Sequence, residues 1–212
     1  SAEVAKKLNE VMTLLYHQVK DVEFMVMGIG DLAYDHAPIQ ISQFESDIRI
    51  AEQLDQVYME HGGGGNGYES YTAAWYMGLY HTRLDCWQRG RRGLLITMGD
   101  EPLNPYLPHR PLAQATGDSL ERDVETHALY QEAIQKYDIY HLHVNHRITD
   151  LYQEEARRTF GSYLPEDHLR IVQVNNIAAT IVEIVTQHAK GEGQGNVHTP
   201  DKMTLLDRLI RW

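Results

Sequence analysis

The sequence contains a single cysteine, Cys86, so no disulfide bond can form within the chain. This favours a reducing compartment, and we expect a cytoplasmic protein. Basic residues are also scarce, since 19 Lys and Arg stand against 30 Asp and Glu, a formal net charge of −11. A field of this sign repels nucleic-acid phosphates and anionic lipid headgroups, and it suits cations or a basic partner. We therefore predict no nucleic-acid partner.

Long hydrophobic runs are missing as well. No apolar stretch is long enough to cross a bilayer, and the first residues lack the basic-then-apolar layout of a signal peptide. We therefore predict no membrane partner. The GxSxG elbow and the phosphate-binding P-loop are absent too. This favours a binding module, although it does not exclude an enzyme, because many active sites are not linear in sequence.

Hydrophobic residues alternate between helical and strand spacing along the chain. Helical spacing occurs at residues 4–19, 48–58, 69–83, 118–136, 150–160 and 177–188. Strand-like runs occur at residues 22–27, 39–44, 93–98, 139–144 and 169–174. The first two strands are close in sequence, which predicts an antiparallel pair. The predicted fold class is α/β, with a mostly parallel sheet, one antiparallel edge strand and helices on both faces.

Two glycine-rich segments interrupt this alternation. The run HGGGGNG at residues 61–67 predicts a loop, and GEGQGN at residues 191–196 predicts a flexible linker. After the linker, Thr199 and Pro200 are typical of a helix start, and the following apolar residues predict an amphipathic helix. We therefore divide the chain into a domain at residues 1–190 and a linker plus C-terminal helix at residues 191–212. We expect this helix to dock on the domain.

Three segments carry a family resemblance. GIGD at residues 28–31 precedes an antiparallel strand, GGGNGYES at residues 63–70 precedes a helix, and LLITMGDEP at residues 94–102 ends a buried strand. In this order they resemble a von Willebrand factor A-type (vWA) domain, of the subgroup with a GGGDxPES loop. The resemblance implies a Rossmann-like α/β/α fold with three layers. It also implies a protein-binding module rather than an enzyme.

The resemblance further implies a metal-ion-dependent adhesion site at the carboxyl end of the sheet. Asp100, Asn66 and Asp31 are the residues of this chain that would contribute to it. Oxygen ligands of this kind suit Mg²⁺, which keeps several waters when it is bound. In the family, an acidic group of the partner protein takes a vacant position on the ion. Asn66 stands where the subgroup has an aspartate, and Tyr68 stands where it has proline, so the site carries less charge than usual.

One part of the family pattern has no counterpart in this chain. The first strand of the family carries a DxSxS signature and lies in the middle of the sheet. The resemblance therefore implies a vWA-like domain that is incomplete at its N-terminus. Without that strand, the strands ending at Met27 and Met98 would each expose an unpaired edge. We expect a strand, or a helix, from another segment or subunit to cover the gap.

Other interpretations of the same residues stay open. Asp31, Asp100 and a divalent ion could serve a Rossmann-like hydrolase or a phosphoryl-transfer enzyme. Asp100 could equally be a capping residue, Asn66 a turn residue, and Glu69 a cap of the following helix. The GxGxxA pattern at residues 28–33 matches a dinucleotide fingerprint only formally, because a strand rather than a helix follows it.

Three histidines form a second candidate site. His141 and His143 share one face of a strand, and His146 follows in the next loop. This alternation could direct two imidazoles at a zinc ion. The alternative is that the histidines are buried beneath a helix and hydrogen-bonded there.

Overall fold

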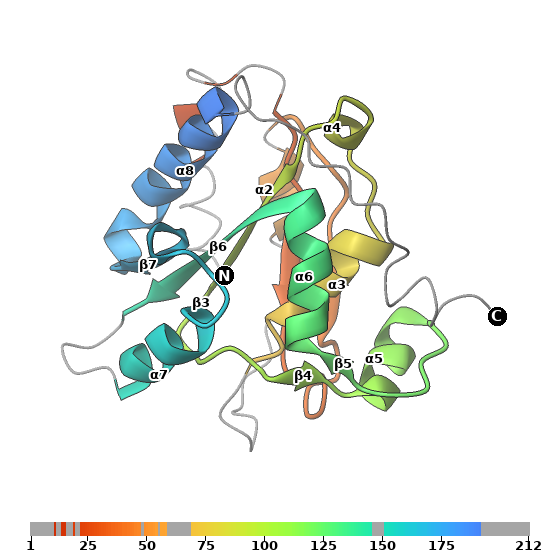
Figure 1. Ribbon diagram of the computed structural model, residues 1–212. Coiled ribbons are helices and arrows are strands. Elements are labelled where there is room, and N and C mark those ends of the chain that lie inside the picture. The colour runs from red at the N-terminus through yellow and green to blue at the C-terminus, as the bar shows by residue number, and fades with distance from the viewer. Residues whose placement is uncertain are drawn as a thin grey trace.

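The computed structural model describes residues 11, 14–15, 19, 22–47, 49–54, 56–58, 69–145 and 151–191. Helices and strands alternate through most of this part of the chain (Figure 1). In chain order the elements are β1 (Met27–Ile29), β2 (Ile39–Ile41), α2 (Arg49–Leu54), α3 (Thr72–Tyr80), α4 (Asp85–Gln88), β3 (Gly93–Gly99), β4 (Tyr106–Leu107), α5 (His109–Thr116), β5 (Val124–Glu125), α6 (Thr126–Lys136), β6 (Tyr137–Val144), α7 (Leu151–Phe160), the short 3-10 helix η1 (Glu166–His168), β7 (Leu169–Val172), the 3-10 helix η2 (Val174–Asn176) and α8 (Ile177–Gly191).

Three strands form a parallel sheet in the order β3–β6–β7. The register between β3 and β6 runs from Gly93 opposite Tyr137 to Gly99 opposite His143. β3 reads GLLITMG, a nearly continuous apolar run of the kind found in parallel strands that are buried on both faces. The predicted α/β fold with a parallel sheet is confirmed at this level.

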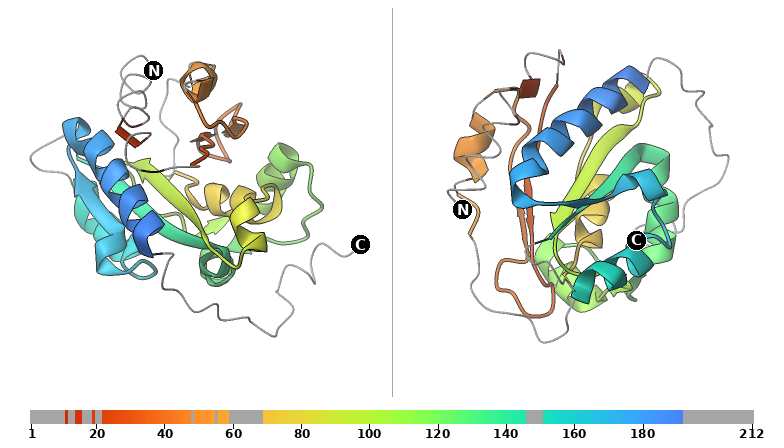
Figure 2. Two further views of the ribbon diagram at one scale, coloured as in Figure 1. Left: turned by 90° about the horizontal axis from the view of Figure 1, so that it is seen from above. Right: turned by 90° about the vertical axis from the view of Figure 1, so that its left-hand side faces the viewer.

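Helices cover both faces of this sheet (Figure 2). α3, α6 and α7 pack on one face, around Leu95 and Ile139. α8 packs on the other face, in clusters that include Leu94 of β3. Val11 and Leu15, from the first helical segment, pack against α8 in that layer. The sheet therefore lies between two helical layers, as expected for an α/β domain.

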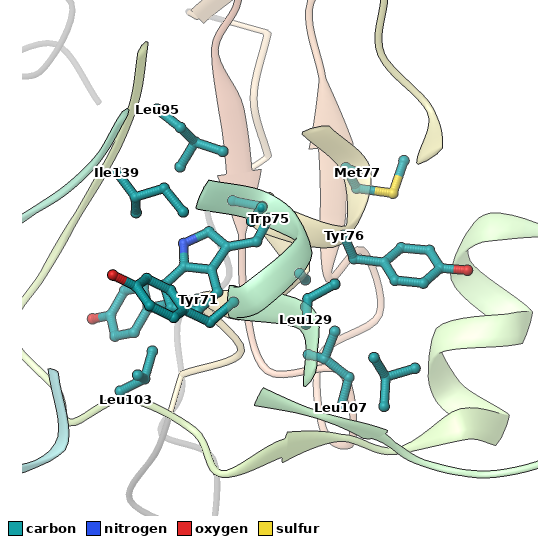
Figure 3. Packing of buried hydrophobic residues seen from close by; sticks show 14 of the residues in the cluster. Tyr71, Trp75, Tyr76, Met77, Leu95, Leu103, Leu107, Leu129 and Ile139 are labelled. Carbon is teal, nitrogen blue, oxygen red and sulfur yellow. The ribbon is translucent and has the colours of Figure 1, made fainter. Parts of the chain in front are cut away.

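The larger core surrounds α3 (Figure 3). Trp75 and Tyr76 are fully buried, and the indole of Trp75 points toward Leu95 and Ile139 of the sheet. Every residue of α3 from Thr72 to Gly78 is buried, which is typical of a helix enclosed by other elements. This packing fixes the first turn of α3 relative to the ends of the strands.

β1 and β2 form a separate, two-stranded antiparallel sheet. The predicted antiparallel pairing is confirmed, but the strand expected at residues 22–27 is shifted. Phe24 makes only an isolated bridge, to Glu45, and regular pairing starts at Met27. Gly28 lies inside the strand instead of ending it. A Cβ atom there would lie 2.7 Å from Val57 Cγ1, so the glycine permits a close approach of the segment after α2.

β1 and β3 belong to different sheets and are not hydrogen-bonded to each other. Direct pairing between them would have contradicted the expectation of a strand in the gap, and it is not observed. In the part of the chain that the structure describes, β1 bonds only to β2, and the only strand bonded to β3 is β6. The strand that fills the gap stays a prediction.

One sequence prediction around residue 118 is wrong. The helix expected at residues 118–136 begins only at Thr126. Gly117, with a φ of +82°, ends α5. Asp118 does not start a helix, because its carboxylate accepts hydrogen bonds from Tyr76 Oη (2.6 Å) and lies 2.7 Å from His81 Nε2.

Two further expectations concern the ends of the chain. The C-terminal helix expected after residue 198 lies outside the described residues. Among the helices that the structure describes, none is both long enough and apolar enough to span a membrane.

Candidate functional site

Carboxyl groups gather where β1 and β3 end. Asp31 follows β1 and Asp100 follows β3, so each strand delivers an acid beyond its carboxyl end. Glu69, just before α3, interacts electrostatically with both, and with Asp35 and Glu101. We call these five residues the acidic edge.

Asp31 is the most buried residue of the acidic edge, with 4% of its surface exposed. Its Oδ1 accepts a 2.7 Å hydrogen bond from the backbone N–H of Ala33. Its own N–H donates to Asp35 Oδ2, also at 2.7 Å. The second carboxylate oxygen, Oδ2, is buried and has no hydrogen-bond partner. A buried, unpartnered carboxylate oxygen is costly, and a ligand that contacts it would recover that cost.

Gly30 allows this turn to close. A Cβ atom at residue 30 would lie 2.1 Å from Asp35 Oδ2, so any larger residue would displace the Asp35 carboxylate. The loop after β1 is therefore folded around its own carboxylates. No helix starts within it, and β2 follows, which does not match the structure that a dinucleotide fingerprint requires.

Glu69 has the most strongly shifted pKa of the acidic edge. Burial, and then the charges of the other four carboxylates, raise the pKa of Glu69 to about 7. Its Oε2 is buried without a hydrogen-bond partner. Burial and then the charge of Asp100 also raise the pKa of Glu101. Negative charge at the acidic edge is thus incompletely compensated, and a bound cation would stabilise it.

Side chains attach the start of α3 to the surrounding loops. Ser70 Oγ accepts a 3.1 Å hydrogen bond from the N–H of Leu32, which ties the loop after β1 to α3. Asn104 accepts from the N–H of Thr72 and donates to Thr72 Oγ1. Both contacts are buried, so the N-terminus of α3 is fixed beside the acidic edge.

The structure describes two of the three residues that the sequence predicts as metal ligands. Asp31 is buried, Asp100 is exposed, and both contribute to the electrostatic field at Glu69. Asn66 lies outside the described residues, so convergence of all three stays a prediction. Sequence reasoning missed Asp35 and Glu101. It also weighed Glu69 as a helix cap, but no side-chain hydrogen bond caps α3, and Glu69 forms a β-bridge instead.

The histidine pair on β6 is fully buried. His141 Nδ1 lies 2.9 Å from Thr97 Oγ1, and the imidazole stacks on Phe160 of α7 with ring centroids 3.7 Å apart. Burial, and then the nearby His143, hold the pKa of His141 well below its ordinary value. His141 is thus a neutral histidine packed beneath a helix. His146, the third histidine of the zinc interpretation, lies outside the described residues.

Within the described part of the chain, no three His, Cys, Asp or Glu side chains lie close enough to hold a metal ion by themselves. Two surface hollows were found away from the acidic edge, with volumes of about 490 and 190 Å³. The first is lined by residues around α4, which are Arg83, Leu84, Asp85, Trp87 and Gln88. The second lies between the end of α7 and β7. Neither includes a carboxylate of the acidic edge.

Comparison with known proteins gives no family assignment. No protein-family model, curated protein or solved structure matches the chain. The function must therefore be argued from the α/β fold and from the geometry of the acidic edge.

Proposed function

We propose that the chain is a protein-binding module of the vWA type that binds a divalent cation such as Mg²⁺ at the acidic edge. The observation that carries the proposal is Asp31 Oδ2, a buried carboxylate oxygen without a partner. It lies at an edge where burial, and then the charges of the other carboxylates, raise the pKa of Glu69 to about 7. A carboxylate held in this way is already partly desolvated and fixed in direction. It therefore needs little reorganisation to bind a cation.

The chemistry of the acidic edge fits such an ion. All of its side-chain donors are carboxylate oxygens, the ligands that hard divalent cations prefer. Asp31 and Asp100 would hold the cation, Glu69 would add charge, and Asn66 would add a carbonyl oxygen. No three of the described side chains lie close enough to hold an ion by themselves, so the proposed site needs water ligands and Asn66 in addition.

Contacts within the described residues hold Asp31 in place and leave Asp100 accessible to a partner. The N–H of Ala33 fixes Asp31 Oδ1, and Ser70 ties the loop after β1 to α3. Asp100 is exposed, so the edge is open to a partner on that side. The bound ion supplies positive charge on a surface that otherwise repels acids. An acidic side chain of another protein can then bind at this edge.

The arrangement of the strands supports the vWA type. An antiparallel hairpin, β1–β2, comes first in the described part, and the parallel strands β3, β6 and β7 follow with helices on both faces. β3 is covered by helices on both faces although it is bonded on one edge only within the described residues. We propose that a strand from another segment or subunit pairs there. We also propose a cytoplasmic location, where Cys86 stays reduced.

Calorimetric titration with Mg²⁺ and Mn²⁺ tests this function directly. At pH 8, where Glu69 is ionised, we expect saturable binding of one ion, and Asp31→Asn should weaken it at least about tenfold because one charged ligand is lost. Asp85→Asn is the matched control. Asp85 is an exposed aspartate on α4, beyond the other end of α3, and its replacement should leave the affinity unchanged. Equal affinities for the two variants would overturn the proposal.

A further inference from the structure

Tyr71 lies between two parts of the acidic edge. Glu69 and the Asp31 loop form one part, and the turn with Asp100 and Glu101 forms the other. It precedes α3, is 5% exposed, and its Oη accepts a 3.3 Å hydrogen bond from the backbone N–H of Glu101. The same oxygen lies against Gly99, where a Cβ atom would be only 1.9 Å away. The Tyr71 hydroxyl therefore rests directly on the backbone where β3 ends and Asp100 begins.

The ring of Tyr71 also contacts the sheet and α7. It meets His141 edge-on, with centroids 5.1 Å apart, and lies 5.8 Å from the ring of Phe160. His141 is in turn bonded to Thr97 on β3. These contacts come from three different elements, so Tyr71 cannot shift without disturbing β3, β6 or α7.

The backbone next to Tyr71 belongs to the other half of the acidic edge. Its N–H donates a 2.8 Å hydrogen bond to the carbonyl of Glu69. Ser70, the preceding residue, binds the loop that contains Asp31. Ser70 and Tyr71 together thus connect the Asp31 loop and Glu69, on one side, with the turn at residues 99–101, on the other.

We propose that Tyr71 is the positioning residue of the acidic edge: it sets the distance from the turn at Asp100 to Asp31 and Glu69. This inference rests on the proposed cation site. Without the hydroxyl, the Glu101 N–H loses its acceptor, and Gly99 leaves the backbone of the turn free to move. Losing such a support outside the ligands themselves typically costs about 10- to 100-fold in metal affinity.

The test compares Tyr71→Phe with Tyr130→Phe as its matched control. Tyr130 is a buried tyrosine of α6 that packs on Trp75 in the same core but does not touch the acidic edge. Mn²⁺ affinity is measured by titration, and the Mn²⁺ electron paramagnetic resonance spectrum of each saturated variant reports the symmetry of its ligands. We expect Tyr71→Phe to weaken Mn²⁺ binding about tenfold and to change the spectrum. Tyr130→Phe should match the wild type in both.

A second variant, Gly99→Ala, displaces the Tyr71 hydroxyl while the tyrosine is kept, and it should weaken Mn²⁺ binding in the same direction. Thermal unfolding without metal shows that each variant is folded before it is titrated. Wild-type affinity and spectrum for both Tyr71→Phe and Gly99→Ala would overturn the role of Tyr71, while weakened binding by Asp31→Asn would leave the cation site standing. Absence of Mn²⁺ binding to the wild type would overturn both.

Discussion

Thr97 on β3 and His141 on β6 lie opposite each other in the parallel ladder and are joined by a hydrogen bond of 2.9 Å between Oγ1 and Nδ1. Thr97 Oγ1 also lies 3.3 Å from the carbonyl of Tyr140, to which it donates its single proton. Nε2 of His141, on the other side of the ring, is buried and has no hydrogen-bond partner. Protonation would therefore place a positive charge in the core with no acceptor at Nε2, so the folded chain favours the neutral imidazole.

This relationship predicts an acid-sensitive fold. Because the pKa of His141 is held below its ordinary value of 6.5, the unfolded chain takes up the proton first as the pH falls. Stability is complete above about pH 6.5 and should decrease below it, by about 1 kcal/mol per pH unit. Urea unfolding at pH 7.5 and pH 5.5 measures the loss. In His141→Phe the same acidification should cost less, and an equal loss in that variant would contradict the assignment to His141.

Asp138 at the start of β6 should respond in a lower pH range. Burial opposes ionisation of its carboxyl, but the hydrogen bond from His188 (2.8 Å) and the charge of Arg92 (2.5 Å) outweigh it and lower its pKa. Its stabilisation is therefore present above about pH 4 and is lost as the pH falls through the lowered value. We expect Asp138→Asn to cost about 1–2 kcal/mol in urea unfolding at pH 7. The exposed Asp167→Asn serves as control, and equal stabilities of the two variants would exclude this role.

The contribution of Glu69 to stability should change with pH in the opposite direction. Its raised pKa, about 7, means that the folded chain holds the proton more tightly than the unfolded chain does. Stability should fall as the pH rises from about 4.5 to 7 and stay level above that range. Solvent screens this half-buried group, so we expect Glu69→Gln to stabilise the cation-free chain by only about 1 kcal/mol at pH 8, and not at pH 4. Differential scanning fluorimetry at both values checks this, and a destabilised Glu69→Gln at pH 8 would contradict it.

The melting temperature in saturating Mg²⁺ gives a second test of Glu69. By compensating the charge at the acidic edge, the ion should raise the melting temperature of the wild type more than that of Glu69→Gln. An equal rise for both would separate Glu69 from the cation site.

Among the described strands β3 is bonded on one edge only, which gives a prediction about exchange of its backbone amides. A strand bonded on one edge only has ladder partners for every second N–H group. We expect protection from hydrogen exchange to alternate along residues 93–99 when the chain is alone, and to become continuous when a strand from a second subunit pairs with it. Continuous protection of the dilute, isolated chain, measured by nuclear magnetic resonance, would contradict an open edge.

Four elements could be predicted from local sequence, since β3, β6, α7 and α8 lie within a few residues of their predicted positions. Burial gives each strand a dense set of apolar residues and gives each helix apolar residues at helical spacing. The region around residue 118 failed for a different reason. Asp118 resembles a helix start, but Tyr76 and His81 use its carboxylate from about 40 residues away in sequence. A contact between residues so far apart in the chain cannot be predicted from the spacing of hydrophobic residues.

The site was predictable in the same uneven way. Asp31 and Asp100 follow strand-like runs, and the carboxyl ends of strands are where ligands gather in this fold class. Asp35 was missed because its part in the site depends on the turn that Gly30 permits. Tyr71 was missed because its role depends on contact with Gly99, which only the folded chain brings about.

In the proposed site Asp31 Oδ2 binds a divalent cation, directly or through one water. The most direct measurement is a crystal structure of the chain grown with Mn²⁺, with the anomalous signal of manganese used to locate the ion. We expect one strong peak at the acidic edge, bound to Asp31 Oδ2 directly or through a single water, and no peak there in Asp31→Asn. A wild-type crystal with Mn²⁺ elsewhere, or with no ion beside Asp31, would contradict the account.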